Sequence, residues 1–204
     1  MLPILLLAAT PVRAQPAPQR LQPSRDVVVN YRVEGEATRL VPGGIQGPVR
    51  LSWDAAGQRL RAEAEGRSQI ALIDLVRHTG QTIDTGLRVV LPLPLRANEL
   101  QPLTLEGARL TPRGHETVAG VACTTYQVDI GRVPGVACLT ADGVPLRGEG
   151  EVNGKPGRFT AISVAYGTLP ASLFVPPPGY ITFTAPEKGG VDLRSLGALL
   201  GRNR

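Results

Sequence analysis

The stretch that decides the fold is Val49-Arg50-Leu51-Ser52-Trp53-Asp54-Ala55-Ala56-Gly57-Gln58-Arg59-Leu60-Arg61. Apolar and polar side chains alternate on both sides of its central turn, residues 54–58. A period of two residues is typical of antiparallel strands that have one buried face and one solvated face. Gly57 gives the turn a residue that tolerates positive φ, which a tight hairpin often requires. The stretch therefore predicts a β-hairpin.

The same alternation recurs along most of the chain and indicates further strands joined by short turns. We expect strands over residues 27–34, 49–54, 59–65, 84–91, 103–111, 124–130, 136–140, 144–152, 159–166 and 180–184. Residues 70–76 are almost entirely apolar, which fits either a strand covered on both faces or a short helical turn. Short helical patterns occur at residues 93–103, 169–174 and 191–200. The sequence thus predicts a mainly β protein, a single strongly curved antiparallel sheet (half-barrel or open barrel) of about ten strands in meander order, with little helix.

Residues 1–14 have the composition of a secretion signal. They contain an apolar run that is too short to span a bilayer, followed by small or compact residues up to Ala14. No Lys or Arg precedes the run, so we expect the translation start to lie upstream of Met1. In the alternative interpretation the run is an apolar first strand, which Pro3 and Pro11 disfavour.

The rest of the chain divides into a leader, one domain and a tail. Residues 15–25 contain three prolines and little to bury, and we expect a flexible leader there. Residues 26–185 are sufficient for one β half-barrel domain with its own core, and residues 186–204 form a tail that is either frayed or a short helix. We expect a periplasmic or secreted protein without a transmembrane span in the mature chain.

Cys123 and Cys138 are the only cysteines of the sequence. In an exported chain the simplest interpretation is a structural disulfide across a hairpin, either with directly opposed cysteines or with a shifted register and a bulge at Gly131 or Gly135. Closing a loop of about fifteen residues would stabilise the fold by about 3 kcal/mol in the chain-entropy model. A zinc site would need four ligands, and a thioredoxin-like pair would have two intervening residues, so both alternatives are disfavoured.

The formal net charge of +5 does not indicate a nucleic-acid-binding surface. Of the 22 Lys and Arg residues only Lys155 and Lys188 are lysines, a bias that fits GC-rich coding. Acidic residues are interspersed with the basic ones, and the one Trp, four Tyr and three Phe are scattered rather than grouped as stacking platforms. We therefore expect no nucleic-acid partner, although weak attraction to an anionic envelope surface fits the charge.

No residue pattern in the sequence predicts catalysis. His78 and His115 stand in turn-like contexts, and Glu116 would point to the opposite face of a strand from His115. Glu149 and Glu151 share a strand face, as a glycosidase pair would, but grouped aromatic platforms for sugar rings are lacking, so we interpret them as solvated. The sequence has no nucleophile elbow, phosphate loop or dinucleotide fingerprint. We predict a protein that is not an enzyme, with no catalytic residue, metal site or cofactor.

Four segments resemble uncharacterised exported bacterial proteins, namely residues 49–61, 118–123, 137–144 and 175–180. Those proteins are distantly similar to the LolA-like lipoprotein-carrier superfamily. The resemblance implies an unclosed antiparallel half-barrel whose concave face holds lipid or lipoprotein acyl chains beneath a helical lid. It extends over most of residues 26–180 and consists of strand and turn patterns. This chain departs from the carriers because it has little helix from which to form a lid.

An open sheet with one apolar face must close, curl or cover that face with a ligand. The candidate ligand-lining residues are Val27, Val29, Tyr31, Val33, Leu51, Trp53 and Leu60. A dry core filled by the same side chains, with Trp53 as an anchor, is an equal alternative. We expect either a binder of a lipid or other hydrophobic ligand, or an envelope module with a filled core and a protein partner at a sheet edge or at the tail.

Overall fold

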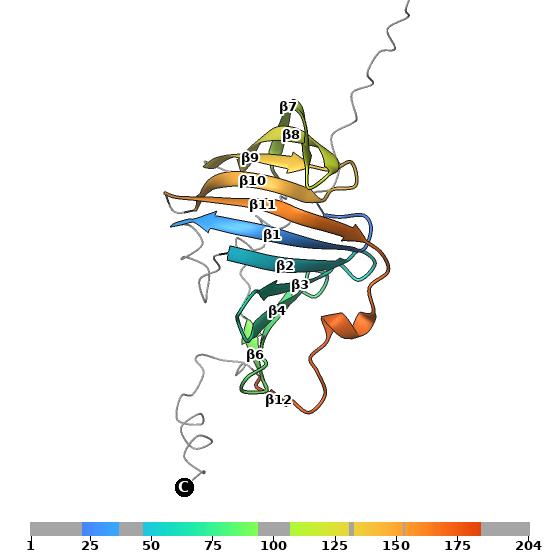
Figure 1. Cartoon of the computed structure of the whole chain (residues 1–204). Helices are drawn as coiled ribbons and strands as arrows, with labels where there is room; N and C mark the ends of the chain where they lie inside the picture. The colour runs from blue at the N-terminus through green and yellow to red at the C-terminus, as the bar shows by residue number, and fades with distance from the viewer. Residues whose placement is uncertain (1–21, 37–46, 94–106, 131–132, 153, 185–204) are drawn as a thin grey trace, which may run out of the picture.

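A computed structural model describes residues 22–36, 47–93, 107–130, 133–152 and 154–184. Within these ranges twelve strands form one sheet (Figure 1). They are β1 (Val27–Gly35), β2 (Gly47–Asp54), β3 (Arg59–Ala64), β4 (Gln69–Asp74), β5 (Thr79–Asp84), β6 (Val89–Leu93), β7 (Arg109–Val118), β8 (Val121–Ile130), β9 (Val133–Leu139), β10 (Pro145–Val152), β11 (Lys155–Tyr166) and β12 (Ile181–Thr182). The 3-10 helix η2 (Ala171–Phe174) lies between β11 and β12, where the sequence predicts one or two helical turns.

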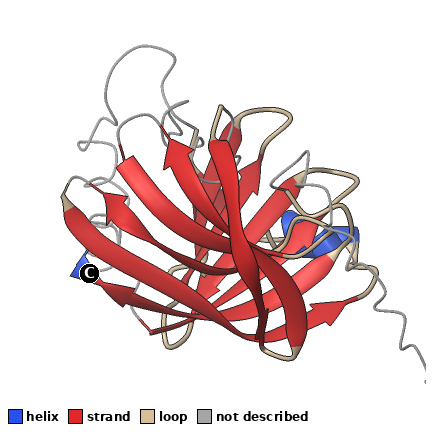
Figure 2. Ribbon diagram, turned by 90° about the horizontal axis from the view of Figure 1, so that it is seen from above, coloured by secondary structure: helices blue, strands red, loops and turns tan. Residues whose placement is uncertain are grey.

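The sheet consists of two meanders that are joined through the pairing of β1 with β11. Its order is β12-β6-β5-β4-β3-β2-β1-β11-β10-β9-β8-β7. Neighbouring strands are antiparallel, except that β12 runs parallel to β6. No ladder joins β7 to β6 or β12 in the described residues, and the sheet curves without closing (Figure 2). The predicted curved half-barrel is confirmed, but a single meander is wrong because β6 and β7 lie far apart in the strand order.

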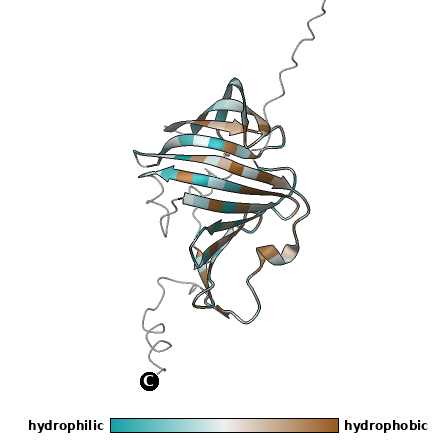
Figure 3. Ribbon diagram, in the orientation of Figure 1, coloured by the Kyte–Doolittle hydropathy of each residue, from teal (hydrophilic) through white to brown (hydrophobic). Residues whose placement is uncertain are grey.

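The alternating pattern produces the strands as expected. The opening hairpin is β2 and β3, in which Trp53 pairs with Leu60 and Asp54 with Arg59. Hydrophobic and hydrophilic residues alternate along β1 and β11 in Figure 3. Successive side chains of a strand point to opposite faces of the sheet, so the two faces differ in hydropathy. Every second residue at the start of β1 is therefore buried.

Residues 70–93 account for part of the difference in strand number. The prediction of one strand over residues 84–91 is wrong, because β5 ends at Asp84 and β6 begins at Val89. Asp84 Oδ1 accepts hydrogen bonds at 3.0 Å from two backbone N–H groups of the following turn, which ends the strand. Asp74 ends β4 in the same way by accepting a 2.8 Å hydrogen bond from the N–H of Arg77.

The main hydrophobic core lies where β1 and β2 face the start of β10. Its buried members are Val27, Val29, Tyr31, Trp53, Leu75, Val118, Cys123, Cys138, Val144, Leu146 and Ala161. A second cluster, of Tyr126, Val128, Ala137 and Leu139, lies on β8 and β9. A third, of Leu72, Ile83 and Val90, lies on β4 to β6, and Tyr180 packs against it.

The predicted disulfide is present, with the Cα atoms of Cys123 and Cys138 5.5 Å apart. The two cysteines are not directly opposed, because Cys138 pairs with Thr125 and Cys123 pairs with Glu116. The β8–β9 pairing nevertheless has no register shift in its described residues. The disulfide therefore forms diagonally across an unbulged hairpin.

Several predictions fall on residues outside the described ranges. These are the signal peptide at 1–14, most of the leader at 15–25, the helical pattern at 93–103 except Leu93, which ends β6, the helical pattern at 191–200, and the tail at 186–204. Within the described ranges, no helix has the length and hydrophobicity needed to cross a membrane.

Candidate functional site

The concave face of the sheet is defined by rows of side chains that run across the strands. Directly paired residues in antiparallel strands project to the same face. One row contains Val27, Trp53, Leu60 and Ile73. The next row contains Val29, Leu51, Ala62, Ala71 and Thr82. Hydrophobic side chains thus continue from the core on β1 outward to β4 on one face, and Thr82 follows them on β5.

Burial divides these rows into two regions. The four side chains nearest the centre of the sheet, Val27, Val29, Tyr31 and Trp53, are between 2% and 6% exposed. The outer ones are only half-buried: Leu51, Leu60, Ala62, Ala71, Ile73 and Thr82. We call these six residues the apolar strip. Its centre is made of the small side chains of Ala62 and Ala71.

The structure therefore separates the predicted lining residues. Val27, Val29, Tyr31 and Trp53 are buried members of the main hydrophobic core. Val33, Leu51 and Leu60 are half-buried and pack against that core. Leu51 and Leu60 belong to the apolar strip, and the other members of the strip were not among the predicted lining residues.

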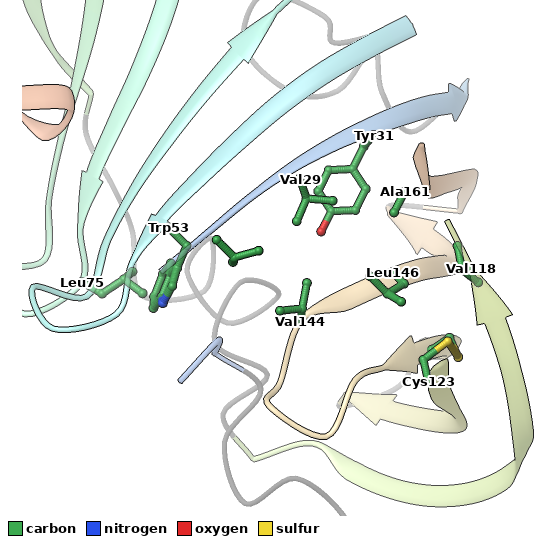
Figure 4. Packing of buried hydrophobic residues seen from close by; sticks show 11 residues of the cluster. Val29, Tyr31, Trp53, Leu75, Val118, Cys123, Val144, Leu146 and Ala161 are labelled. Carbon is green, nitrogen blue, oxygen red and sulfur yellow. A yellow bond between two sulfur atoms is a disulfide. The ribbon is translucent and has the colours of Figure 1, made fainter. Parts of the chain in front are cut away.

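Two polar groups show how the core is anchored. Tyr31 Oη donates a 2.6 Å hydrogen bond to the carbonyl oxygen of Pro145, and Trp53 Nε1 donates a 2.8 Å bond to that of Pro23. Figure 4 shows Val29 and Tyr31 pointing toward Val144, with Trp53 to one side. Burial raises the pKa of the Tyr31 phenol far above its ordinary value, so the group is a constant donor at physiological pH. Trp53 is thus a core residue that also holds Pro23 in place.

The residues that sequence reasoning missed are Ala62, Ala71, Ile73 and Thr82. Ala62 lies in a predicted strand, but alternation assigns a side chain to a face without showing what lies beside it. The other three lie in or beyond residues 70–76, whose strand boundaries the sequence leaves ambiguous. The β2-β3-β4-β5 register is what brings all four together.

A separate depression of about 600 Å³ lies on the other half of the sheet. Its lining includes the polar side chains of Glu34, Gln127, Glu149, Glu151 and Arg158 and the apolar side chains of Pro134, Val136 and Pro156. The floor includes four glycines, one each on β1, β9, β10 and β11. None of the seven predicted lining residues contributes to it. Its lining thus combines charged side chains with apolar ones, and it does not continue the hydrophobic rows of β1 to β5.

A polar cluster surrounds the disulfide. Glu116 accepts a 2.9 Å hydrogen bond from Thr125 Oγ1 and lies 3.1 Å from Arg147 Nη1. Glu116, Cys123 and Cys138 have the spacing of a metal-ligand group, but both cysteines are in the disulfide and offer no thiolate. The cluster is therefore best explained as an ion pair covering the disulfide.

The residues considered for catalysis lie apart from the apolar strip. His115 is on β7 opposite Thr124, so its predicted turn context is wrong, although its side chain is exposed as expected. His78 is exposed in the β4–β5 turn with φ of 53°. Glu149 and Glu151 are exposed on β10.

Fold and site together define an open β half-barrel with a buried central core and a half-buried apolar strip on its concave face. No protein-family model and no curated protein matches the sequence. Among solved structures, MucB in complex with MucA(peri) is similar at a TM-score of 0.50 and 14% identity, covering 81% of this chain and 59% of that chain. This chain thus spans less than two thirds of the MucB chain.

A second similar structure is an uncharacterized conserved protein from Thermus thermophilus, with a TM-score of 0.50 and 15% identity over 78% of this chain and 90% of that one. At these identities the likeness shows a shared fold. A domain from Vibrio parahaemolyticus, provisionally named an outer membrane lipoprotein-sorting protein, gives 9% identity and a TM-score of 0.36 over 77% and 91% of the two chains. That score is too low to support an argument.

Proposed function

We propose that this chain is an exported, non-catalytic protein of the periplasm that binds a hydrophobic or lipid-like ligand on its concave face. The observation that supports the proposal is the apolar strip, which stays half-buried although it continues directly from the buried core. Exposed apolar side chains that lie together mark binding surfaces in soluble proteins. The ligand would cover Leu51, Leu60 and Ile73 and would approach the sheet most closely above Ala62 and Ala71.

Membership of the LolA-like superfamily is part of the same proposal. The unclosed sheet and the fold shared with MucB support it. The disulfide supports an extracytoplasmic location, because such bonds persist in oxidising compartments. The apolar strip corresponds in kind to the concave acyl-binding face that the superfamily resemblance implies.

A second candidate function is an envelope interaction module that binds a protein. MucB, which shares the fold, forms a complex with MucA(peri). In this alternative the apolar strip would contact apolar side chains of a protein partner instead of a lipid. The two functions can be distinguished experimentally, because a bound lipid co-purifies with the protein even when no partner chain is present.

Native mass spectrometry of the mature protein, purified from its own envelope without detergent exchange, tests the proposal. We expect an adduct of lipid mass that is lost in Thr82→Asp, which introduces a charge on the apolar strip. Gln81→Asp is the matched control, because Gln81 is the neighbouring half-buried residue on the opposite face of β5. A protein adduct in place of lipid would favour the second candidate, and no adduct with either variant or wild type would contradict the first.

A further inference from the structure

Residues 167–184 follow an unusual path across the fold. They leave β11 near the middle of the sheet and end at β12, on the outer edge of β6, although five strands lie between β11 and β6 (Figure 1). The segment therefore connects the centre of the sheet to its edge without passing through the strands between them.

Asp26, the residue before β1, fastens the near end of this segment. Its Oδ2 accepts a 3.0 Å hydrogen bond from the N–H of Leu169, and its carbonyl oxygen accepts one of 3.4 Å from Gly167. Its Oδ1 accepts a 2.9 Å hydrogen bond from the N–H of Ala55 in the β2–β3 turn. One carboxylate thus ties the segment to both β1 and the opening hairpin.

The middle of the segment attaches to the convex face of β3. Arg59 and Arg61 flank Leu60 and so point away from the apolar strip. Arg61 Nη1 donates a 3.0 Å hydrogen bond to the carbonyl oxygen of Leu173, and the Arg59 guanidinium lies 5.1 Å from the ring centroid of Phe174. Phe174 is buried, with 7% of its surface exposed. This attachment lies directly behind the apolar strip.

The far end attaches to β6 through a short strand and one aromatic ring. Tyr180 packs against the third hydrophobic cluster, of Leu72, Ile83 and Val90, which lies on the convex face because Leu72 pairs with Arg61. β12 is two residues long, held by a 3.0 Å hydrogen bond from Ile181 N–H to the carbonyl of Arg88 and a 2.8 Å bond from Phe183 N–H to that of Val90. The Tyr180 ring centroid also lies 5.7 Å from the Arg88 guanidinium. Ile181 is 59% exposed, so β12 itself buries little apolar surface beyond Tyr180.

Between the two attachments the chain is stiff. Pro176, Pro177 and Pro178 are consecutive, and consecutive prolines favour the extended polyproline conformation, which acts as a semi-rigid spacer. Gly179, with φ of 78°, then makes the bend that a residue with a side chain would resist. The spacer fixes the separation between the attachment at β3 and the attachment at β6.

We propose that residues 167–184 are a brace that sets the curvature of β3 to β6, and that release of β12 from β6 flattens this part of the sheet and lets the ligand leave. The second half of the statement rests on the proposed function, because the apolar strip lies on the strands that the brace holds. Release begins at β12, since this attachment is a strand of only two residues at the edge of the sheet, with Ile181 59% exposed.

Two variants of the full mature chain change the brace in opposite directions. In Pro176→Gly/Pro177→Gly/Pro178→Gly the attachments remain but the spacer becomes flexible. In Val89→Cys/Ile181→Cys a disulfide joins two residues that are paired between β6 and β12, which locks the far end. Pro156→Gly, on β11 and outside the brace, is the control for losing a proline. The readouts are amide hydrogen exchange by mass spectrometry and the dissociation rate of bound 11-(dansylamino)undecanoic acid.

We expect the flexible-spacer variant to exchange amides of β4 to β6 at least fivefold faster than wild type, with β8 to β11 unchanged, and to release the probe at least fivefold faster. The locked variant should slow both. Unchanged β4–β6 exchange in the flexible-spacer variant would overturn the brace. Faster exchange with unchanged probe release would overturn its control of the ligand. If wild type binds no probe, the proposed function fails instead, and the brace is judged on hydrogen exchange alone.

Discussion

Tyr31 Oη lies 2.6 Å from the carbonyl oxygen of Pro145, a residue 114 positions further along the chain. This hydrogen bond crosses the space that the curved sheet encloses and joins β1 to the start of β10. It satisfies a backbone carbonyl beside the core residues Val144 and Leu146, which are 1% and 0% exposed. The central part of the concave face is therefore closed by specific contacts, and the apolar strip begins beyond it.

Tyr31→Phe removes the donor and leaves the Pro145 carbonyl without this partner. An unsatisfied buried polar group costs about 1–3 kcal/mol, so we expect the free energy of unfolding in urea to fall by about that amount. Tyr166→Phe is the control, because it removes a hydrogen bond of 3.2 Å to Asp142 in an exposed setting and should cost less than about 0.5 kcal/mol. Equal effects of the two substitutions would show that the Tyr31 contact does not fasten the core.

Gly148→Ala tests the packing between β10 and β11. A Cβ atom at this position would overlap the ring of Phe159, which pairs with Gly148 and packs edge-on against Tyr31. Overpacking of this kind costs about 1–3 kcal/mol in unfolding free energy. Gly114→Ala is the control, because a Cβ there would meet no atom within 4 Å. A loss of stability at Gly114 as large as that at Gly148 would contradict this account of the core.

Removal of the disulfide should lower stability without removing the ligand site. In the chain-entropy model, Cys123→Ala/Cys138→Ala reduces the unfolding free energy by about 3 kcal/mol. The apolar strip lies on β2 to β5, whereas the disulfide joins β8 to β9, so we expect the affinity for a fatty-acid probe to change less than threefold. Urea titration and probe binding measure the two effects. Loss of binding in a variant that remains folded would place the β8–β9 hairpin in the site.

The stability of the fold should decrease in acid through Asp142 and Asp54. Burial by itself would raise the pKa of Asp142, but hydrogen bonds from Thr140 and Arg25 outweigh it, and the pKa lies below the ordinary value of 3.8. The pKa of Asp54 is lowered against burial in the same way, by hydrogen bonds from Gly57 and Arg59. A lowered pKa means that the stabilisation is present well above pH 3.8 and is lost as the pH falls through the folded-state value.

The measurement is the melting temperature between pH 7 and pH 2. Asp142→Asn should lower the melting temperature at pH 7 and make it fall less steeply below pH 4. Glu149→Gln is the control, at an exposed carboxylate on β10, and should leave the pH dependence of the melting temperature unchanged. A wild-type curve that rises on acidification would have the wrong sign for these two groups.

The sequence is sufficient to predict the strands but not their neighbours. Alternation around Trp53 correctly gives the β2–β3 hairpin, because both faces of a strand are encoded within a few residues. The pairing of β1 with β11 joins residues such as Val27 and Tyr166, and no local pattern encodes it. No local pattern encodes the contact between Asp26 and Leu169 either, since the two residues are 143 positions apart. Residues 84–91 were misassigned because the Asx-type turn at Asp84 interrupts an otherwise strand-like run.

The candidate site likewise contains residues that local alternation predicts and residues that only the tertiary structure brings together. Leu51 and Leu60 were predicted as lining residues because each lies on the apolar face of a clearly alternating strand. Val29 and Trp53 also lie on the apolar face of an alternating strand, but both are buried. Val29 belongs to the same core cluster as Leu146 of β10, and Trp53 hydrogen-bonds to Pro23. These contacts depend on the curvature of the whole sheet. Ala62 and Ala71 are small, and hydrophobic patterns give little weight to alanine. Their importance comes from where the register places them.

The most direct test of the central claim is a fluorescence titration of the purified, delipidated mature protein with 11-(dansylamino)undecanoic acid. We expect saturable binding to wild type, at least tenfold weaker binding to Thr82→Asp, and binding within twofold of wild type for Gln81→Asp, with all three proteins equally folded by circular dichroism. Absence of saturable binding to the wild type, or equal loss in both variants, would contradict a hydrophobic ligand on the concave face.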